Sequence, residues 1–350
     1  MSKPMSGPDR RTLLKAGAFA VAALAPGMQL MVSRAGHAAD SAKVVIQYDW
    51  LMSNGQIGDV VAIQGGYFKD AGIEVSFSPG GPNSSTVPPV ISGAAQLGQF
   101  SETSQLFNAR ASGVPVKILA CGFRTGPYAF TSLPKAPIRS TADLKGKKIG
   151  MQPTARFLID AILAKAKIDP ADVTIVNVGF DKAPLVRGEV DAIGGWITNT
   201  QALSVVGDDR IDLLVRDLGL PSYANVYFAS DEAAANNADV LARFIGAVAR
   251  GWEWTYNNPE EAVKRTVAAY PELDLNWELK TIDLILKMSF DAETAKDGWG
   301  TFSPASLEEQ LAIFDSIGQY KDGRPKLADV YTDAVLTKTA DVRPKLGAKA

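Results

Sequence analysis

The chain has 350 residues, of which 46% are hydrophobic and 21% are charged, and its formal net charge is −2. That length is enough for two ordinary domains. The charge balance argues against nucleic acid or an anionic membrane as a partner, because both attract strongly basic surfaces.

Residues 1–39 contain the three parts of an export signal in the usual order. Arg10 and Arg11 are followed by the apolar stretch 16–25, which is too short for a membrane span of roughly 20 residues. Small residues then offer a cleavage site after Ala38 or Ala39. We expect residues 1–39 to be a twin-arginine signal peptide and the mature protein to be soluble in the periplasm. The alternative interpretation is a disordered basic leader.

The mature chain keeps 31 basic and 37 acidic side chains, a formal charge of −6, and no histidine, because His37 is the only one. Histidine is the usual general base and zinc ligand, so its loss excludes catalytic triads and typical zinc sites. Cys121 is the single cysteine and lies in the apolar run 116–123, where we expect a buried, inert thiol. We therefore expect no enzyme activity, no cofactor and no metal.

The pattern along the chain predicts an α/β fold. Ten apolar runs are typical of strands, at 43–49, 73–77, 95–100, 116–123, 128–133, 147–151, 173–178, 191–195, 211–216 and 224–230. Helical patterns at 57–70, 102–112, 155–168 and 199–206 alternate with them, as in mainly parallel sheets with helices on both faces. After residue 230 the pattern predicts only helices, at 237–257, 259–269, 276–289 and 305–318.

Two stretches of the chain, 89–100 and 184–196, share one plan. Each starts a helical turn with proline, continues through a glycine, and ends in a short apolar strand that closes on an aromatic residue, Phe100 or Trp196. One interpretation is that any helix–glycine–strand unit looks alike. The other is a pair of similar α/β lobes, whose strands would present their carboxyl ends to a shared ligand cleft.

Two motifs support a family resemblance. The stretch "GGYFKDAGIEV" at 65–75 resembles "GYFxxEGLxV", and "ADLKGKKIG" at 142–150 resembles "DLKGKKVG". From about Lys43 to Tyr320 the chain resembles a type II periplasmic binding protein of the nitrate, sulfonate and thiamine-pyrimidine-precursor family. Such proteins deliver solutes to ABC importers. The most similar branch binds thiamine-pyrimidine precursors, since Asp49 and Trp50 resemble its "DWxPN" start.

The resemblance implies two lobes and a set of partners. The expected first lobe is 40–126 together with 228–350, which includes a helical C-terminal region, and the expected second lobe is 127–227. The expected partners are a small-molecule ligand and an ABC permease with its ATPase in the inner membrane. We expect a monomer that binds no nucleic acid.

The chain departs from that branch at positions that matter for the ligand. The branch's proline and asparagine positions hold Met52 and Ser53, its histidine position holds Gln56, and Asn54 fits only with a one-residue shift. The acid that takes an aminopyrimidine edge in the branch falls on Thr200. We therefore expect a neutral ring, with carbonyl groups to which Asn199 or Thr200 donates.

The candidate ligand-binding residues follow predicted strands or begin predicted helices. Trp50 and Trp196 are expected to stack on a flat ring, although a lone tryptophan is more often core packing. At a helix start, a hydroxyl or carboxyl side chain either caps the helix or faces the cleft. The remaining candidates are Asn54, Ser101, Glu102, Thr103, Gln152, Thr154, Asn199, Thr200 and Tyr223.

Together these features predict a periplasmic binding protein that captures a small heteroaromatic solute, such as a thiamine-pyrimidine precursor or a related nitrogen heterocycle. Alternative ligands are a sulfonate, nitrate or riboflavin. Alternative functions are an enzyme of pyrimidine synthesis on the same scaffold and a ligand-sensing receptor subunit.

Overall fold

The computed structural model describes residues 41–81 and 85–349, which belong to one compact unit. The expected signal peptide, 1–39, lies outside the described residues, as do positions 82–84 of the loop after the second strand. None of the helices in the described part of the chain is long and apolar enough to cross a membrane.

The first of two sheets has the strand order β2-β1-β3-β10-β4. Strand β1 is parallel to its neighbours β2 and β3, whereas β10 is antiparallel to both β3 and β4. Its strands are β1 (Ala42–Tyr48), β2 (Ile73–Ser78), β3 (Leu97–Glu102), β4 (Val116–Phe123) and β10 (Ala224–Ser230).

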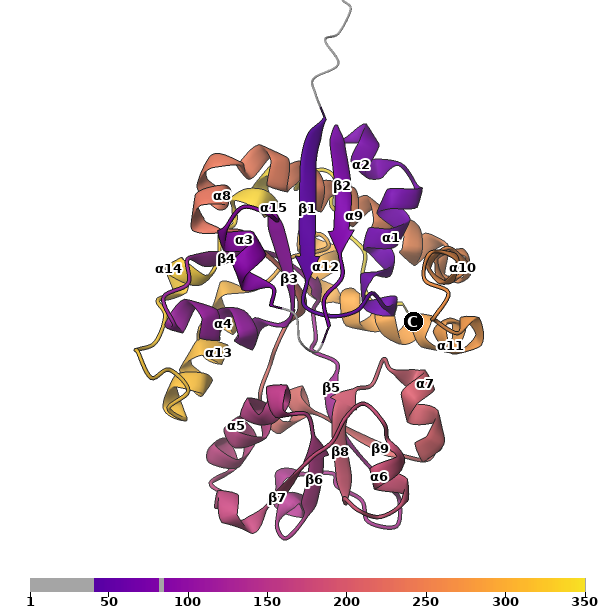
Figure 1. Cartoon of the computed structure of the whole chain (residues 1–350), viewed down its shortest axis with the longest axis vertical. Helices are drawn as coiled ribbons and strands as arrows, with labels where there is room; N and C mark the ends of the chain where they lie inside the picture. The colour runs from indigo at the N-terminus through magenta and orange to yellow at the C-terminus, as the bar shows by residue number, and fades with distance from the viewer. Residues whose placement is uncertain (1–40, 82–84, 350) are drawn as a thin grey trace, which may run out of the picture. The chain divides into compact units, whose positions relative to one another are not determined.

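The second sheet repeats this arrangement, with the strand order β7-β6-β8-β5-β9. Here β6 is parallel to β7 and β8, and β5 is antiparallel to β8 and β9. The strands are β5 (Tyr128–Ser132), β6 (Lys148–Met151), β7 (Thr174–Asn177), β8 (Ala192–Trp196) and β9 (Ile211–Leu214). Figure 1 shows α5 (Arg156–Ala166), α6 (Ala183–Val186) and α7 (Thr200–Leu203) beside these strands.

The two stretches with a shared plan occupy the same place in their sheets. Helix α3 (Val87–Ile91) leads into β3 and α6 leads into β8, each through a glycine with positive φ, 76° at Gly93 and 75° at Gly188. Glycine takes this left-handed conformation at little cost. The backbone N–H of Gln96 donates to the carbonyl of Val45 and its side-chain oxygen accepts from the N–H of Val45. Asp191 makes the same two bonds with Lys148.

All ten predicted strands are present, with small differences at their ends. Residues 224–227, which the sequence placed in the second lobe, belong to β10 and pair with β3 in the first sheet. The single helix predicted at 57–70 is wrong. It is divided into α1 (Ile57–Gln64) and α2 (Tyr67–Asp70), because Gly66 has φ 74° and interrupts the helix.

The helix predicted at 102–112 is α4 (Thr103–Ala111), and residues 304–316 form α13 (Pro304–Ser316) with a Ser303 cap. The C-terminal part is helical as expected. It contains α8 (Asp231–Asn236), α9 (Ala238–Asn257), α10 (Pro259–Ala269), α11 (Leu275–Ser289), α12 (Ala292–Asp297), α14 (Leu327–Val330) and α15 (Ala334–Lys338).

Helices α1 and α9 cross at two glycines, which brings the first sheet's helical layer close to the C-terminal region. A Cβ atom at Gly251 would lie 2.0 Å from the carbonyl oxygen of Gly58, and one at Gly58 would lie 2.3 Å from the Trp252 ring. Because Gly58 and Gly251 have no side chains, the backbones of α1 and α9 can come into direct contact. Trp252 is fully buried beside this crossing and packs against it.

Candidate functional site

A cavity of about 430 Å³ lies where the parallel strands of the two sheets end. Its walls include Trp50 after β1, Glu102 at the end of β3, Gln152 after β6, Phe180 after β7 and Trp196 at the end of β8. Ligand sites of open α/β sheets occur at these carboxyl ends. The volume is in the range of small-molecule sites, and both sheets contribute to it.

Aromatic rings form much of the cavity wall. The ring of Trp50 lies 5.0 Å from that of Phe180 at an interplanar angle of 52°, and the ring of Trp196 lies 6.2 Å from that of Phe123. Phe180 is 45% exposed, which is unusual for a large apolar ring. Trp50 and Trp196 both line the cavity, so each offers ring surface to a flat ligand.

The carboxylate of Asp49 holds the end of β1 against α4 and the end of β3. It accepts hydrogen bonds from the backbone N–H of Ser101 at 2.7 Å, from the Ser101 hydroxyl at 3.1 Å and from the side-chain amide of Gln105 at 3.1 Å. Burial raises the pKa of Asp49, and these hydrogen bonds oppose the shift. Since three donors of the protein satisfy this carboxylate, its main effect is to position Trp50, the next residue.

Glu102 lies in the cavity wall with an almost fully buried carboxyl group. Neither of its carboxyl oxygens has a hydrogen bond of good geometry, although the side chain faces the backbone N–H of Gln105 in a capping box of α4 and the Ser222 hydroxyl lies close enough to lower its pKa. Burial, with a smaller contribution from the charge of Asp49, raises the pKa of Glu102 to about 8. The hydroxyl of Tyr128, another cavity residue, is also buried without a partner. These groups are available to a ligand, because buried polar atoms normally have partners.

Lys182 is a cavity residue that the sequence analysis did not identify. It is only 3% exposed, and its ammonium donates to the carbonyl of Gly194 at 3.0 Å. Burial lowers the pKa of Lys182 to about 8, and the charges of Asp212 and Asp181 oppose the shift. The sequence signal was its position shortly after a predicted strand, two residues beyond Phe180.

Six of the predicted ligand-binding residues line the cavity: Trp50, Ser101, Glu102, Gln152, Trp196 and Asn199. Four others bond to the protein away from it. The Asn54 amide donates to the carbonyl of Thr198 at 3.2 Å, and the Tyr223 hydroxyl accepts from the N–H of Ser303 at 3.0 Å. The hydroxyl of Thr103 donates to Gln310, and that of Thr200 bonds to Thr281. The side chain of Thr154 is outside the described part of the structure.

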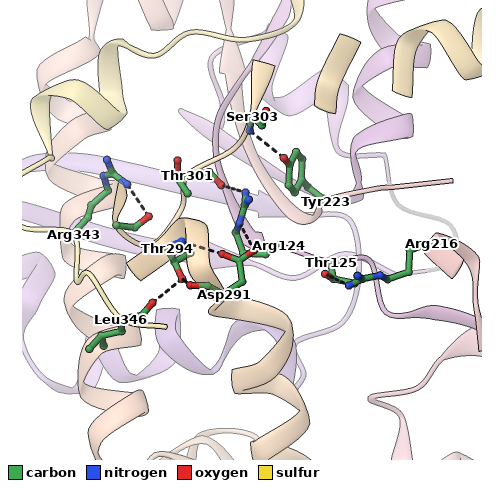
Figure 2. A network of polar contacts seen from close by, with 11 residues as sticks. Arg124, Thr125, Arg216, Tyr223, Asp291, Thr294, Thr301, Ser303, Arg343 and Leu346 are labelled. Carbon is green, nitrogen blue, oxygen red and sulfur yellow. Dashed lines mark hydrogen bonds and ion pairs between the residues drawn. The ribbon is translucent and has the colours of Figure 1, made fainter. Parts of the chain in front are cut away.

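The chain passes between the two sheets twice, and the two passages are held side by side. The first joins β4 to β5 and the second leads into β10, and the N–H of Gly126 in the first donates to the carbonyl of Ser222 in the second at 3.0 Å. In Figure 2 the guanidinium of Arg124 lies between the Asp291 carboxylate, 3.0 Å away, and the Thr301 carbonyl, 2.6 Å away. Arg124 thus anchors the first passage to the C-terminal helical region.

Residues 54–262 match the model of the family described as NMT1/THI5 like, which is more than half of the chain. The chain belongs to the NMT1/THI5-like family.

Relatives in this family include proteins whose names describe binding. The chain is 30% identical over 284 residues to the "Formylaminopyrimidine-binding protein" of Halalkalibacterium halodurans, which covers 78% of this chain and 84% of that protein. It is 31% identical over 253 residues to the "Riboflavin-binding protein RibY" of Chloroflexus aurantiacus, covering 69% of this chain and 71% of that protein.

A family relative with an enzyme name is the "4-amino-5-hydroxymethyl-2-methylpyrimidine phosphate synthase" of Legionella pneumophila. It is 24% identical over 238 residues, covering 66% of this chain and 75% of that protein. The family thus contains proteins named for binding and proteins named for synthesis.

The fold is that of solved binding proteins. The "periplasmic aliphatic sulphonate binding protein SsuA" of Escherichia coli aligns with a TM-score of 0.61 at 18% identity, covering 84% of this chain and 99% of that chain. Two five-stranded mixed sheets and a helical C-terminal region confirm the expected type II periplasmic binding protein fold.

The buried carboxyl of Glu102 predicts a pH dependence of stability. Its pKa is about 8 in the folded protein and roughly 4.3 in an unfolded chain, so over this range the folded state holds a proton that unfolding releases. The unfolding free energy should therefore fall as the pH rises from 5 to 8. Glu102→Gln removes this titration. Between pH 5 and pH 8 the unfolding free energy of the wild type should therefore fall by about 2 kcal/mol or more relative to that of the variant.

Urea unfolding of both proteins at pH 5 and pH 8 measures this difference. Other titrating groups, including the buried Asp59, are common to both proteins and cancel in the comparison. Equal changes in wild type and Glu102→Gln between the two pH values would contradict the assignment.

Proposed function

We propose that this protein is the substrate-binding component of an ABC importer and captures a small planar heteroaromatic solute. One observation carries the proposal: aromatic rings from the strand ends of both sheets, Trp50, Phe180 and Trp196, line one cavity. Ring-to-ring contacts contribute about 0.5–1.5 kcal/mol each beyond simple burial, so such a wall favours flat ligands.

The binding relatives support a nitrogen heterocycle as the ligand. Formylaminopyrimidine and riboflavin, in the names of two relatives, both contain flat nitrogen-containing rings. A thiamine-pyrimidine precursor or a related heterocycle is therefore our first candidate, and riboflavin, sulfonate and nitrate are the alternatives. The hydroxyl of Thr200 is bonded to Thr281, so Asn199 is the better placed of the two expected donors.

We also propose a non-enzymatic role. The mature chain has no histidine, and the carboxylate of Asp49 is used within the protein by three donors. The synthase name of one relative is the argument for an enzyme instead. Conversion of a bound pyrimidine precursor by the purified protein would favour that alternative.

We propose that the protein has two lobes that close on the ligand, because the chain passes twice between the sheets. The proposed first lobe contains 40–126 and the residues from β10 onward, and the second contains 127 to the end of the second passage, before Ala224. Proteins of this construction move by bending at such connections. We expect a monomer whose radius of gyration, measured by small-angle X-ray scattering, is smaller at saturating ligand than without ligand. An unchanged radius would count against closure.

We propose export by the twin-arginine route, as the N-terminal pattern predicts, and delivery to a permease and its ATPase. Replacing Arg10 and Arg11 by lysine keeps the charge but removes the pair, so precursor should accumulate in the cytoplasm. Lys15→Arg is the matched control that leaves the pair intact. Normal periplasmic yield from the double variant would rule out this route.

The ligand class is testable with a panel of solutes on the mature protein. A hydroxymethylpyrimidine, a formylaminopyrimidine, a flavin, an alkanesulfonate and nitrate are compared by thermal shift. A ligand present at 100 times its Kd adds about 2.7 kcal/mol of stability. Trp50→Ala should weaken every ring ligand by about tenfold, since stacking depends little on ring identity.

Trp254→Ala is the matched control for Trp50→Ala. Trp254 lies in α9, outside the cavity, and its ring contacts the guanidinium of Arg265 at 4.1 Å. It should leave ligand affinity unchanged. If nitrate or the alkanesulfonate binds most tightly and Trp50→Ala does not weaken it, the stacking proposal is wrong and Trp50 only packs.

A further inference from the structure

Lys182 is a buried cation in a cavity where the protein leaves it incompletely paired. Among the described residues that line the cavity, it is the one with a cationic side chain. An ammonium has three donor hydrogens, and the carbonyl of Gly194 accepts one of them. Buried charges in proteins are normally paired, because an isolated charge is expensive to remove from water.

The neighbouring acids do not supply the missing partner. Asp212 accepts from the guanidinium of Arg210 at 3.0 Å and from the hydroxyl of Thr131, and Asp181 is exposed. Within the described ranges no carboxylate forms an ion pair with Lys182. Of the two carboxyl groups in the cavity wall, Asp49 is bonded to Ser101 and Gln105. The other, Glu102, has a pKa raised to about 8 by burial, so it is mostly uncharged at neutral pH.

A glycine makes room for this ammonium in the cavity wall. A Cβ atom at Gly195 would lie 2.5 Å from the Nζ atom of Lys182, closer than any real contact. Both residues line the cavity, at the end of β8 where Trp196 follows. The bare strand end therefore places the cation next to one of the rings expected to stack on the ligand.

We infer that the ligand is a planar ring that carries an anionic oxygen group, a carboxylate or a sulfonate, and that Lys182 binds this group. The inference rests on the proposed function and narrows its ligand from heteroaromatic solutes in general to ring acids. It also revises the expectation of a neutral ligand, which took no account of Lys182. The ammonium then gains the charged acceptor that the protein itself does not provide, and charge-assisted hydrogen bonds of this kind are among the strong ones.

The test uses ring acids and their uncharged amides, matched in shape. Pyridine-3-carboxylate, pyrimidine-5-carboxylate and benzoate are titrated by calorimetry against their three carboxamides. The wild-type protein should bind at least one acid about tenfold or more tightly than its amide. Lys182→Met, which keeps the length of the side chain without its charge, should remove this preference by weakening acid binding at least tenfold more than amide binding.

Two further variants separate binding from folding. Lys145→Met removes an exposed lysine outside the cavity and should preserve the preference for acids. In Gly195→Ala the new methyl group would displace the end of the Lys182 side chain and no backbone atom, so this variant should fold. It should still weaken acid binding more than amide binding.

Each outcome bears on the inference. If wild type binds only uncharged rings, or if no ring acid binds, the inference is overturned, while binding of an amide or another neutral ring leaves the proposed function standing. If Lys182→Met keeps the acid preference, Lys182 is not the partner of the anionic group. If a non-aromatic sulfonate binds most tightly and Lys182→Met abolishes its binding, the role of Lys182 stands and the proposed aromatic ligand does not.

Discussion

The hydrogen bond from the N–H of Gly126 to the carbonyl of Ser222 joins the two passages of the chain between the sheets. The strand that runs antiparallel to its neighbours in each sheet comes directly after a passage, β5 after the first and β10 after the second. The same chain segments therefore connect the sheets and help to align them. The anchoring of Arg124 on Asp291 and Thr301 holds this connection to the C-terminal region (Figure 2).

The passages lie next to one residue of the cavity wall, Glu102. The carboxyl group of Glu102 lies over Gly126, where a Cβ atom would come within 3.0 Å of its Oε1 atom, and beside Ser222. Because glycine has no side chain, the carboxyl group can reach the junction of the two passages. A change in the angle between the sheets would alter the surroundings of Glu102, so ligand binding and its protonation are expected to influence one another.

Some polar groups in the cavity wall have hydrogen-bond partners within the protein, and others do not. Asp49 accepts hydrogen bonds from Ser101 and from Gln105, and the side-chain oxygen of Gln105 accepts one from the N–H of Glu102, so these groups stabilise the wall. Lys182 and Tyr128 have few or no partners of their own. Buried groups without partners cost free energy unless a ligand pairs with them, which makes them the better guides to what the cavity binds.

The sequence predicted the strands well because each is a short apolar run between turn residues, and the carboxyl-end rule then located Trp50, Glu102, Gln152 and Trp196. It could not predict that Thr103, Thr200 and Tyr223 bond to Gln310, Thr281 and Ser303. Those partners lie 207, 81 and 80 residues away in the chain.

Lys182 was missed for a related reason. In the sequence it is one lysine beside an aspartate in a polar turn, a pattern that normally indicates exposure. Its burial depends on two glycines of β8. The carbonyl of Gly194 accepts its hydrogen bond, and Gly195, which has no side chain, leaves room for its ammonium. Burial of this kind is a property of the packed structure and not of local composition.

A crystal structure of the mature protein with its tightest-binding solute would show whether a ring stacks on Trp50 beside Lys182. We expect one ring in van der Waals contact, about 3.5–4 Å, with the face of Trp50. We also expect an oxygen of the ligand about 2.7–3.2 Å from the Nζ atom of Lys182. A ligand bound outside this cavity, or inside it without touching Trp50, would rule out stacking on Trp50 as the basis of binding.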